Sequence, residues 1–125
     1  MGENSKEYYF IEDGQGKIRI SDEVIAAIAA NAALESDGVH SLAAVTPTSD
    51  LTDFFVKKSI PKGIRIVIGA DNSCIVDVHL LIKAGAVVTE VAQSVQLNVK
   101  NAIESMVGIT VAESNVYVAG VAFQK

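Results

Sequence analysis

Asp77 and His79 are the residues whose types and spacing come nearest to a chemical site. They stand two positions apart in the alternating segment from Cys74 to Ile82, and such alternation puts residues i and i+2 on one face of a β-strand. A carboxylate beside a histidine can orient the imidazole for acid–base work or metal binding. No third ligand stands near them, and His40 falls on a different predicted strand. We therefore interpret the pair as part of the solvent face of a sheet covered on one side.

The other residues that could bind a ligand or react do not group into a site. Cys74 is the only cysteine, which excludes an internal disulfide, and its parity with the apolar positions favours an inert buried thiol. Asn31 projects beside the bulky positions of a predicted helix; if it is buried, it needs hydrogen-bond partners and could fix a packing register. The glycines at 14 and 16 lack the third glycine of a dinucleotide-binding loop and indicate a turn. The sequence predicts no catalytic, cofactor-binding or metal-ligating residue.

The composition is that of a single packed domain. Half of the 125 residues are hydrophobic, a fifth are charged, and the net charge is −5. The acidic balance argues against nucleic acid and against direct docking on an anionic membrane, because both need clustered Lys and Arg. No signal peptide and no apolar run long enough to cross a bilayer are apparent. We expect a cytoplasmic protein with a flexible N-terminal tail over 1–15 and one domain over 16–125, without direct membrane insertion.

Hydrophobic periodicity predicts strands that alternate between buried and exposed positions. They are expected over 17–20, 39–45, 64–68, 74–82 and 115–123, and the third and fourth of these form a hairpin with one buried face. The apolar parity of the last strand switches at Gly120, which indicates a β-bulge. The irregular segment 46–62 is interpreted as a flap that carries Leu51, Phe54 and Phe55.

Two helices are expected, and their patterns differ. The first covers 21–34, with Ser21 as its N-cap and Gly38 as its C-cap glycine. The second covers 90–106 and is closed by Gly108. Its apolar residues form one stripe: Val91, Ala92, Val95, Val99, Ala102, Ile103 and Met106. The predicted fold is α+β, a two-layer domain with one mixed β-sheet and the two main helices packed on one face.

The first helix is apolar almost all the way round. One side carries its bulky residues: Val24, Ile25 and Ile28. Alanines fill the opposite side, and a helix without a polar face needs cover on more than one side. Leu97 is the apolar exception on the polar side of the second helix. We therefore take Ala27, Ala30 and Leu97 as a candidate interaction surface.

The chain as a whole resembles the alkaline-shock and general-stress protein family of Gram-positive bacteria, the envelope stress response proteins. The resemblance covers about residues 16–123. It begins with the segment from Gly16 to Ile25, read as GKIRISDEVI. It continues in Ala32 to Glu35, Gly38-Val39, Leu42, Lys62 to Ile64, Glu90 to Ala92, Val95-Gln96, Val99, Ala102 to Glu104, Met106, Gly108-Ile109, Asn115-Val116 and Val118 to Val121. The chain departs from the family pattern at Ala84 and at Val88-Thr89, which touch a strand end and a helix start.

This resemblance implies a non-catalytic cytoplasmic protein tied to cell-envelope stress. It implies a homo-oligomer or scaffold, in some members held near the membrane by a separate anchor protein. It also implies an alternative, a regulator that binds a subunit of acetyl-CoA carboxylase or another enzyme of fatty-acid synthesis. A third hypothesis comes from the residues alone: a small-molecule binder or enzyme that uses Asp77 and His79.

Overall fold

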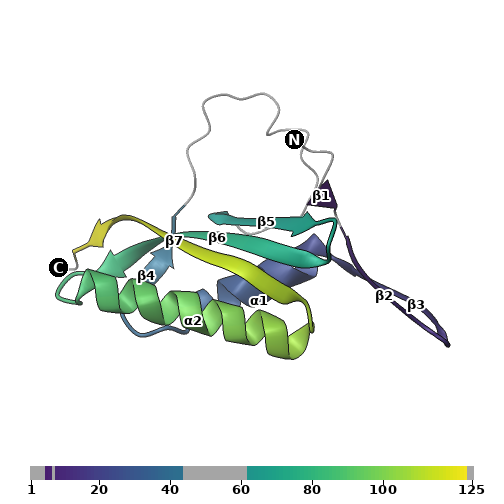
Figure 1. The fold of residues 1–125 in the computed structure, drawn as a ribbon. Helices are drawn as coiled ribbons and strands as arrows, with labels where there is room; N and C mark the ends of the chain where they lie inside the picture. The colour runs from purple at the N-terminus through teal and green to yellow at the C-terminus, as the bar shows by residue number, and fades with distance from the viewer. Residues whose placement is uncertain (1–4, 7, 44–61, 124–125) are drawn as a thin grey trace, which may run out of the picture.

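The computed structural model describes residues 5–6, 8–43 and 62–123. These residues form a mixed five-stranded sheet, two helices on one of its faces, and a separate two-stranded sheet (Figure 1). The predicted α+β fold is confirmed, with the second sheet as an addition. The flap expected over 46–62 lies outside the described residues except for its last residue, Lys62.

Strand β6 (Ser73–Lys83) is the centre of the five-stranded sheet. Along one side it pairs antiparallel, first with β5 (Ile64–Gly69) and then with β4 (Val39–Leu42). Along its other side it pairs in parallel with β7 (Thr110–Ala122) over its whole length. The short β1 (Ser5–Lys6) pairs with β5. The predicted hairpin and its mixed sheet are therefore confirmed.

Alternation along β6 decides which face of the sheet is covered. Every second residue is at most 1% exposed and faces the helices: Cys74, Val76, Val78, Leu80 and Ile82. Burial of each large aliphatic side chain contributes roughly 1.5–3 kcal/mol. The strand's register therefore follows its hydrophobic pattern, because a slip of one residue would move this whole set to the opposite face.

The last strand is longer than expected. The prediction began it near residue 115, whereas β7 begins at Thr110. The predicted bulge is confirmed, since Leu80 pairs with Val118 and Leu81 pairs with Gly120, which leaves Ala119 as the extra residue.

Helix α1 (Asp22–Leu34) begins as predicted but ends differently. The Oγ of Ser21 accepts a hydrogen bond from the backbone N–H of Glu23 at 3.0 Å. The expectation that Gly38 caps its end was wrong, because the C-cap is Glu35 and the Ser36 hydroxyl donates to the Ala32 carbonyl at 2.9 Å. Gly38 has φ +90 and lies against α2, where an added Cβ would stand 2.5 Å from a methyl of Val91.

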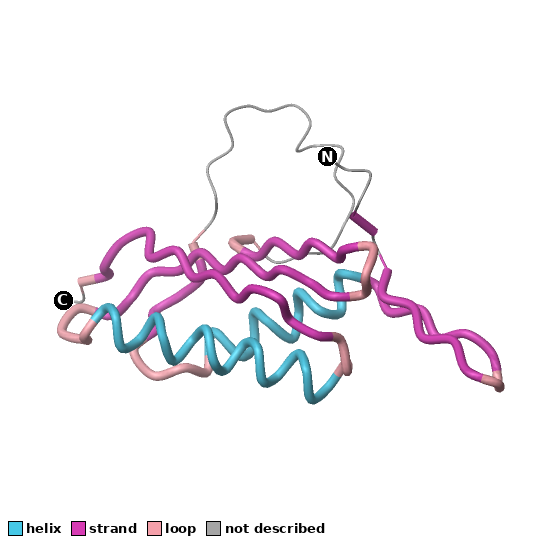
Figure 2. The backbone as a smooth tube through the Cα atoms, in the orientation of Figure 1, coloured by secondary structure: helices cyan, strands magenta, loops and turns pink. Residues whose placement is uncertain are grey.

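Helix α2 (Val88–Met106) lies beside α1 under the same face of the sheet (Figures 1 and 2). Its buried stripe is Val91, Val95, Val99 and Ile103, as predicted. Met106 was also expected in that stripe and is instead 71% exposed. It lines a hollow beside α1, and nothing among the described residues covers it. Gly108 follows the C-cap Val107 in a left-handed conformation, as expected.

The N-terminal part of the chain differs from the flexible tail expected over 1–15. Tyr8–Asp13 forms β2, which pairs antiparallel with β3 (Gly16–Ser21) across a two-residue loop. The strand predicted over 17–20 therefore exists, but it belongs to this hairpin and not to the main sheet. We call the hairpin the β2–β3 arm. It projects past the end of the helices (Figure 1).

Candidate interaction surfaces

Asp77 and His79 lie on the outer face of β6, as their spacing predicted, and both side chains are engaged by other strands. Asp77 Oδ1 accepts a hydrogen bond from Asn115 Nδ2 at 2.9 Å. The ring of His79 stacks on Tyr117, with centroids 4.7 Å apart and planes 20° apart. The contacts follow from the register, since Asp77 pairs with Asn115 and His79 pairs with Tyr117.

His79 makes a second contact, with the backbone before β5. Nδ1 lies 3.3 Å from the carbonyl oxygen of Gly63. Because a carbonyl oxygen only accepts, this hydrogen bond requires the proton of a neutral imidazole to sit on Nδ1. Both polar side chains thus join β6 to neighbouring backbone and strands. Within the described ranges, no group of three or more His, Cys, Asp or Glu could hold a metal ion.

Cys74 is buried at 1% exposure under the helix layer. Burial raises the pKa of its thiol to about 11, and the nearby carboxylate of Glu104 adds to the rise. A thiol with this pKa holds almost no thiolate at neutral pH, and the thiolate is the nucleophilic form. The expected buried, inert thiol fits this position.

Two other polar residues lie on the surface. Asn31 is exposed and donates to Glu35 Oε2 at 3.3 Å, one helical turn on. It therefore does not set a packing register inside the core. His40 is the extra residue of a β-bulge in β4, and its Nδ1 lies 3.0 Å from Ser41 Oγ.

The three residues proposed as an interaction surface lie in three different surroundings. Ala30 is only 7% exposed and packs in the core. Ala27 is exposed on the outer side of α1. Leu97 is 58% exposed on α2, in a depression lined by residues of α2 and β7. The structure therefore does not join them into one patch, and Ala27 and Leu97 stay separate candidates.

Ala27 lines a groove between the two helices, which we call the α1–α2 groove. Its volume is about 410 Å³, and it is lined by Ala27, Ile28, Asn31, Ala32, Glu35, Ala102 and Met106. The lining is mainly apolar, and the Asn31–Glu35 hydrogen bond forms its polar rim. Val24, one turn before Ile28, is also an exposed large apolar residue. This groove combines the outward side of α1 with the exposed Met106.

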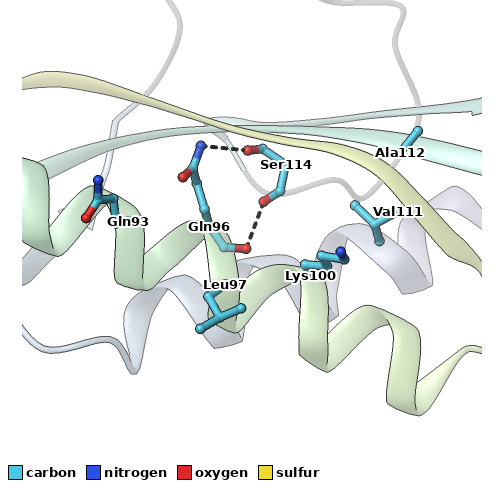
Figure 3. Close-up of a pocket in the computed structure, with 7 residues that line it drawn as sticks. All are labelled: Gln93, Gln96, Leu97, Lys100, Val111, Ala112 and Ser114. Carbon is cyan, nitrogen blue, oxygen red and sulfur yellow. Dashed lines mark hydrogen bonds between the residues drawn. The ribbon is translucent and has the colours of Figure 1, made fainter.

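Leu97 belongs to a shallower depression of about 340 Å³ between α2 and β7. Its floor is closed by two hydrogen bonds between Gln96 and Ser114, each 3.1 Å long. Figure 3 shows Gln96 directed toward Ser114 on the strand, whereas Leu97 points away from it. The depression is therefore mixed in character, and Leu97 is a single apolar side chain at its rim.

The β2–β3 arm carries apolar residues that lie in the tail predicted from the sequence. Phe10 is exposed and contacts the ring of Tyr8, and the guanidinium of Arg19 lies 4.7 Å from the centroid of the Tyr8 ring. On the opposite face, Ile11 pairs with Ile18. The signal was present in the sequence: a run of four β-favouring residues, Tyr-Tyr-Phe-Ile, stands shortly before the Asp13-Gly14 turn signal.

Comparison with known proteins decides the family. The model of the alkaline shock protein 23 family, described by a cell envelope-related function, matches residues 11–123. The chain belongs to this family. The family resemblance predicted from the sequence is thereby confirmed. No catalytic family is indicated for the chain.

Family relatives of similar length cover most of the chain. YloU, an uncharacterized protein of Bacillus subtilis, is 33% identical over 107 residues, which cover 85% of this chain and 88% of the relative. YqhY, also uncharacterized and from Bacillus subtilis, is 32% identical over 86% of this chain and 78% of its own length. Spy1535 of Streptococcus pyogenes is 30% identical over 88% of this chain and 82% of its own length. No solved structure matches the chain.

None of the helices in the described parts of the chain is long and apolar enough to cross a bilayer.

Proposed function

We propose that this chain is a non-catalytic cytoplasmic interaction protein that associates with itself and acts in cell-envelope homeostasis. The observation that carries the proposal is the family match over residues 11–123, whose description is cell envelope-related. It places nearly the whole described fold, including most of the β2–β3 arm, inside the family pattern.

The distribution of polar and apolar groups supports an interaction role. Asp77 and His79 come nearest to a chemical site, but both side chains contact neighbouring strands and backbone. Large apolar side chains are exposed on the helix layer instead: Val24, Leu34, Leu97 and Met106. Such apolar surface on a small protein favours contact with another protein.

Two measurements test the proposal. Light scattering of the purified full chain over a wide concentration range should give a mass above that of the 13.2 kDa monomer. A strain without the gene should grow more poorly than its parent under alkaline or cell-wall stress, and an Asp77→Ala, His79→Ala variant should restore growth. A variant that fails to restore growth while it folds and associates normally would favour chemistry at Asp77 and His79 over the proposed role.

The partner is addressed by affinity purification of the tagged chain from its own cells. We propose a membrane-anchor protein as the partner that holds the assembly near the envelope, in line with the family resemblance. Recovery of an acetyl-CoA carboxylase subunit, with no growth defect under envelope stress, would instead favour the alternative of a regulator of fatty-acid synthesis.

A further inference from the structure

The β2–β3 arm has an apolar face that the described part of the molecule does not cover. Among the described residues, β2 and β3 pair only with each other. A two-stranded ribbon is marginally stable by itself in water and gains stability when one face packs against another element. None of the other described elements lies beside the outer half of this arm (Figures 1 and 2). Its stability therefore points to a second surface.

The face that needs cover is defined by the register. Tyr9 pairs with Ile20 and Ile11 with Ile18, so all four side chains lie on one face of the ribbon. Tyr9 and Ile20, at the base, pack against the core. Ile11 and Ile18, farther out, continue this face beyond the body, and Ile18 is 51% exposed.

The α1–α2 groove is the complementary uncovered surface. It is mainly apolar, it is hollowed, and its short side chains Ala27 and Ala32 leave Met106 exposed. The arm cannot fill the groove of its own copy. It leaves the body at Ser21, its base is tied to the end of α2 by a contact of 3.5 Å between Tyr9 Oη and the Gly108 carbonyl oxygen, and it then points away from the helices (Figure 1).

Charge favours the arm over the helix layer of another copy as the occupant. Segments 22–37 and 88–106 hold six acidic residues and one lysine, whereas residues 8–21 hold two of each sign. Two helix layers placed face to face would bring like charges together, which is unfavourable. The neutral arm avoids this repulsion.

We propose that the β2–β3 arm of one copy docks in the α1–α2 groove of a second copy, with Ile11 and Ile18 against Ala27, Ile28 and Met106. The inference rests on the self-association proposed above and names its surfaces. The contact joins two different surfaces, so it either closes reciprocally into a two-fold pair or continues from copy to copy as a chain.

Substitutions on each surface test the contact. Ile18→Asp disables the arm and Ala27→Glu disables the groove, and both positions are exposed, so the fold should survive. Each should weaken self-association by at least about tenfold, the size expected at a central apolar contact. Val121→Asp, on exposed β7, is the matched control and should leave association unchanged. Circular dichroism and thermal melting check that each variant is folded.

A mixture of the two disabled variants separates this contact from every symmetric alternative. The Ile18→Asp copy keeps an intact groove, and the Ala27→Glu copy keeps an intact arm. Their equimolar mixture should therefore associate more strongly in light scattering than either variant does alone. An interface of arm with arm, or of groove with groove, gives no such recovery and would overturn the proposal.

Cross-linking provides a second, independent readout. Native Cys74 is buried, so cysteines placed at Ile18 and Ala27 in separate chains would be the reactive thiols. Oxidation of the mixed Ile18→Cys and Ala27→Cys proteins should give a disulfide-linked heterodimer in preference to either homodimer. Equal yields of all three products would contradict the assigned contact.

The outcomes distinguish the two proposals. A wild-type chain that stays monomeric at every concentration removes self-association itself, and with it this contact. A wild-type oligomer that survives both Ile18→Asp and Ala27→Glu overturns only the arm-in-groove contact and leaves the proposed function standing.

Discussion

Helices α1 and α2 cover the same face of one sheet but reach the core by different means. α2 buries a narrow stripe of Val91, Val95, Val99 and Ile103 and turns its polar residues outward. α1 buries mostly alanines together with Ile25, and it leaves the larger Val24 47% exposed. The alanine side of α1, which the sequence suggests as an uncovered surface, is largely its buried side.

The difference shows how side-chain size selects the buried face when polarity does not. Small side chains allow a helix to pack close to its neighbours, and Ala26, Ala29 and Ala33 of α1 are all fully buried. The bulky Val24 and Leu34 lie outward, and Ile25 is the large side chain of α1 that is fully buried in the core. The outward bulky residues of α1, not its alanines, then supply most of the exposed apolar surface.

The largest loss of stability is expected from substitutions in the buried stripe of α2. Ile103→Ala removes a side chain that is 0% exposed and leaves a cavity, so the free energy of unfolding should fall by about 2–5 kcal/mol. Urea denaturation measures the change. Val24→Ala on α1 is the control and should lower it by well under 1 kcal/mol. Equal losses in both variants would contradict the contrast between the helices.

The alanine packing of α1 should respond to added volume. Ala29 is 0% exposed, so Ala29→Leu forces extra methylenes into a packed interface and should destabilise by about 1–3 kcal/mol. Ala27→Leu adds the same atoms on the exposed side and should be nearly neutral. Thermal unfolding of both variants gives the comparison, and a stable Ala29→Leu protein would show that α1 does not pack closely.

The thiol beneath the helix layer should give stability a distinct alkaline dependence. Burial raises the folded-state pKa of Cys74 to about 11 from its ordinary value of 9.0, so the thiol favours the folded state fully below pH 9. That contribution is lost as pH rises from 9 to 11, because the unfolded chain ionises first, and it amounts to up to about 2 kcal/mol. The measurement is urea denaturation at pH 8, 9, 10 and 11. Cys74→Ala should flatten this part of the profile, and an unchanged slope would remove Cys74 as its cause.

A smaller change in the free energy of unfolding is expected at the polar contact between the two helices. Asn98 Nδ2 donates to Ser36 Oγ at 2.9 Å and so joins α2 to the end of α1. Asn98→Ala should lower the free energy of unfolding by about 1 kcal/mol, the usual net contribution of such a hydrogen bond. Leu97→Ser, one residue away and exposed, should change the free energy of unfolding by less than about 0.5 kcal/mol. A double-mutant cycle with Ser36→Ala should show coupling for Asn98 and none for Leu97.

Much of the fold was open to prediction because it depends on local pattern. The alternation from Cys74 to Ile82 fixed the buried face of β6, and the stripe from Val91 to Ile103 fixed that of α2. Met106 shows where the pattern fails. Its helical angle matches the stripe, but it stands at a hollow between α1 and α2. That neighbour relation is not encoded in the local sequence.

The candidate surfaces were harder to predict for the same reason. Ala27 and Ala30 are equivalent in the sequence, whereas the structure exposes the first in a groove and buries the second. The tail predicted over 1–15 left out the arm, although Tyr8–Ile11 are strong β-formers. The Asp13-Gly14 turn signal before the strand at 17–20 could have identified it.

By itself, the sequence determined both helices, most of the strands and the family, because periodicity, caps and the family pattern are local or linear properties. It set where α1 begins, which side of β6 is apolar, and that Cys74 stands among core positions. Only the tertiary structure decided which side of the nearly all-apolar α1 is buried, that Met106 is exposed, and that the β2–β3 arm stands apart from the main sheet. The physical reason is that burial depends on the size and shape of neighbours brought together from distant parts of the chain.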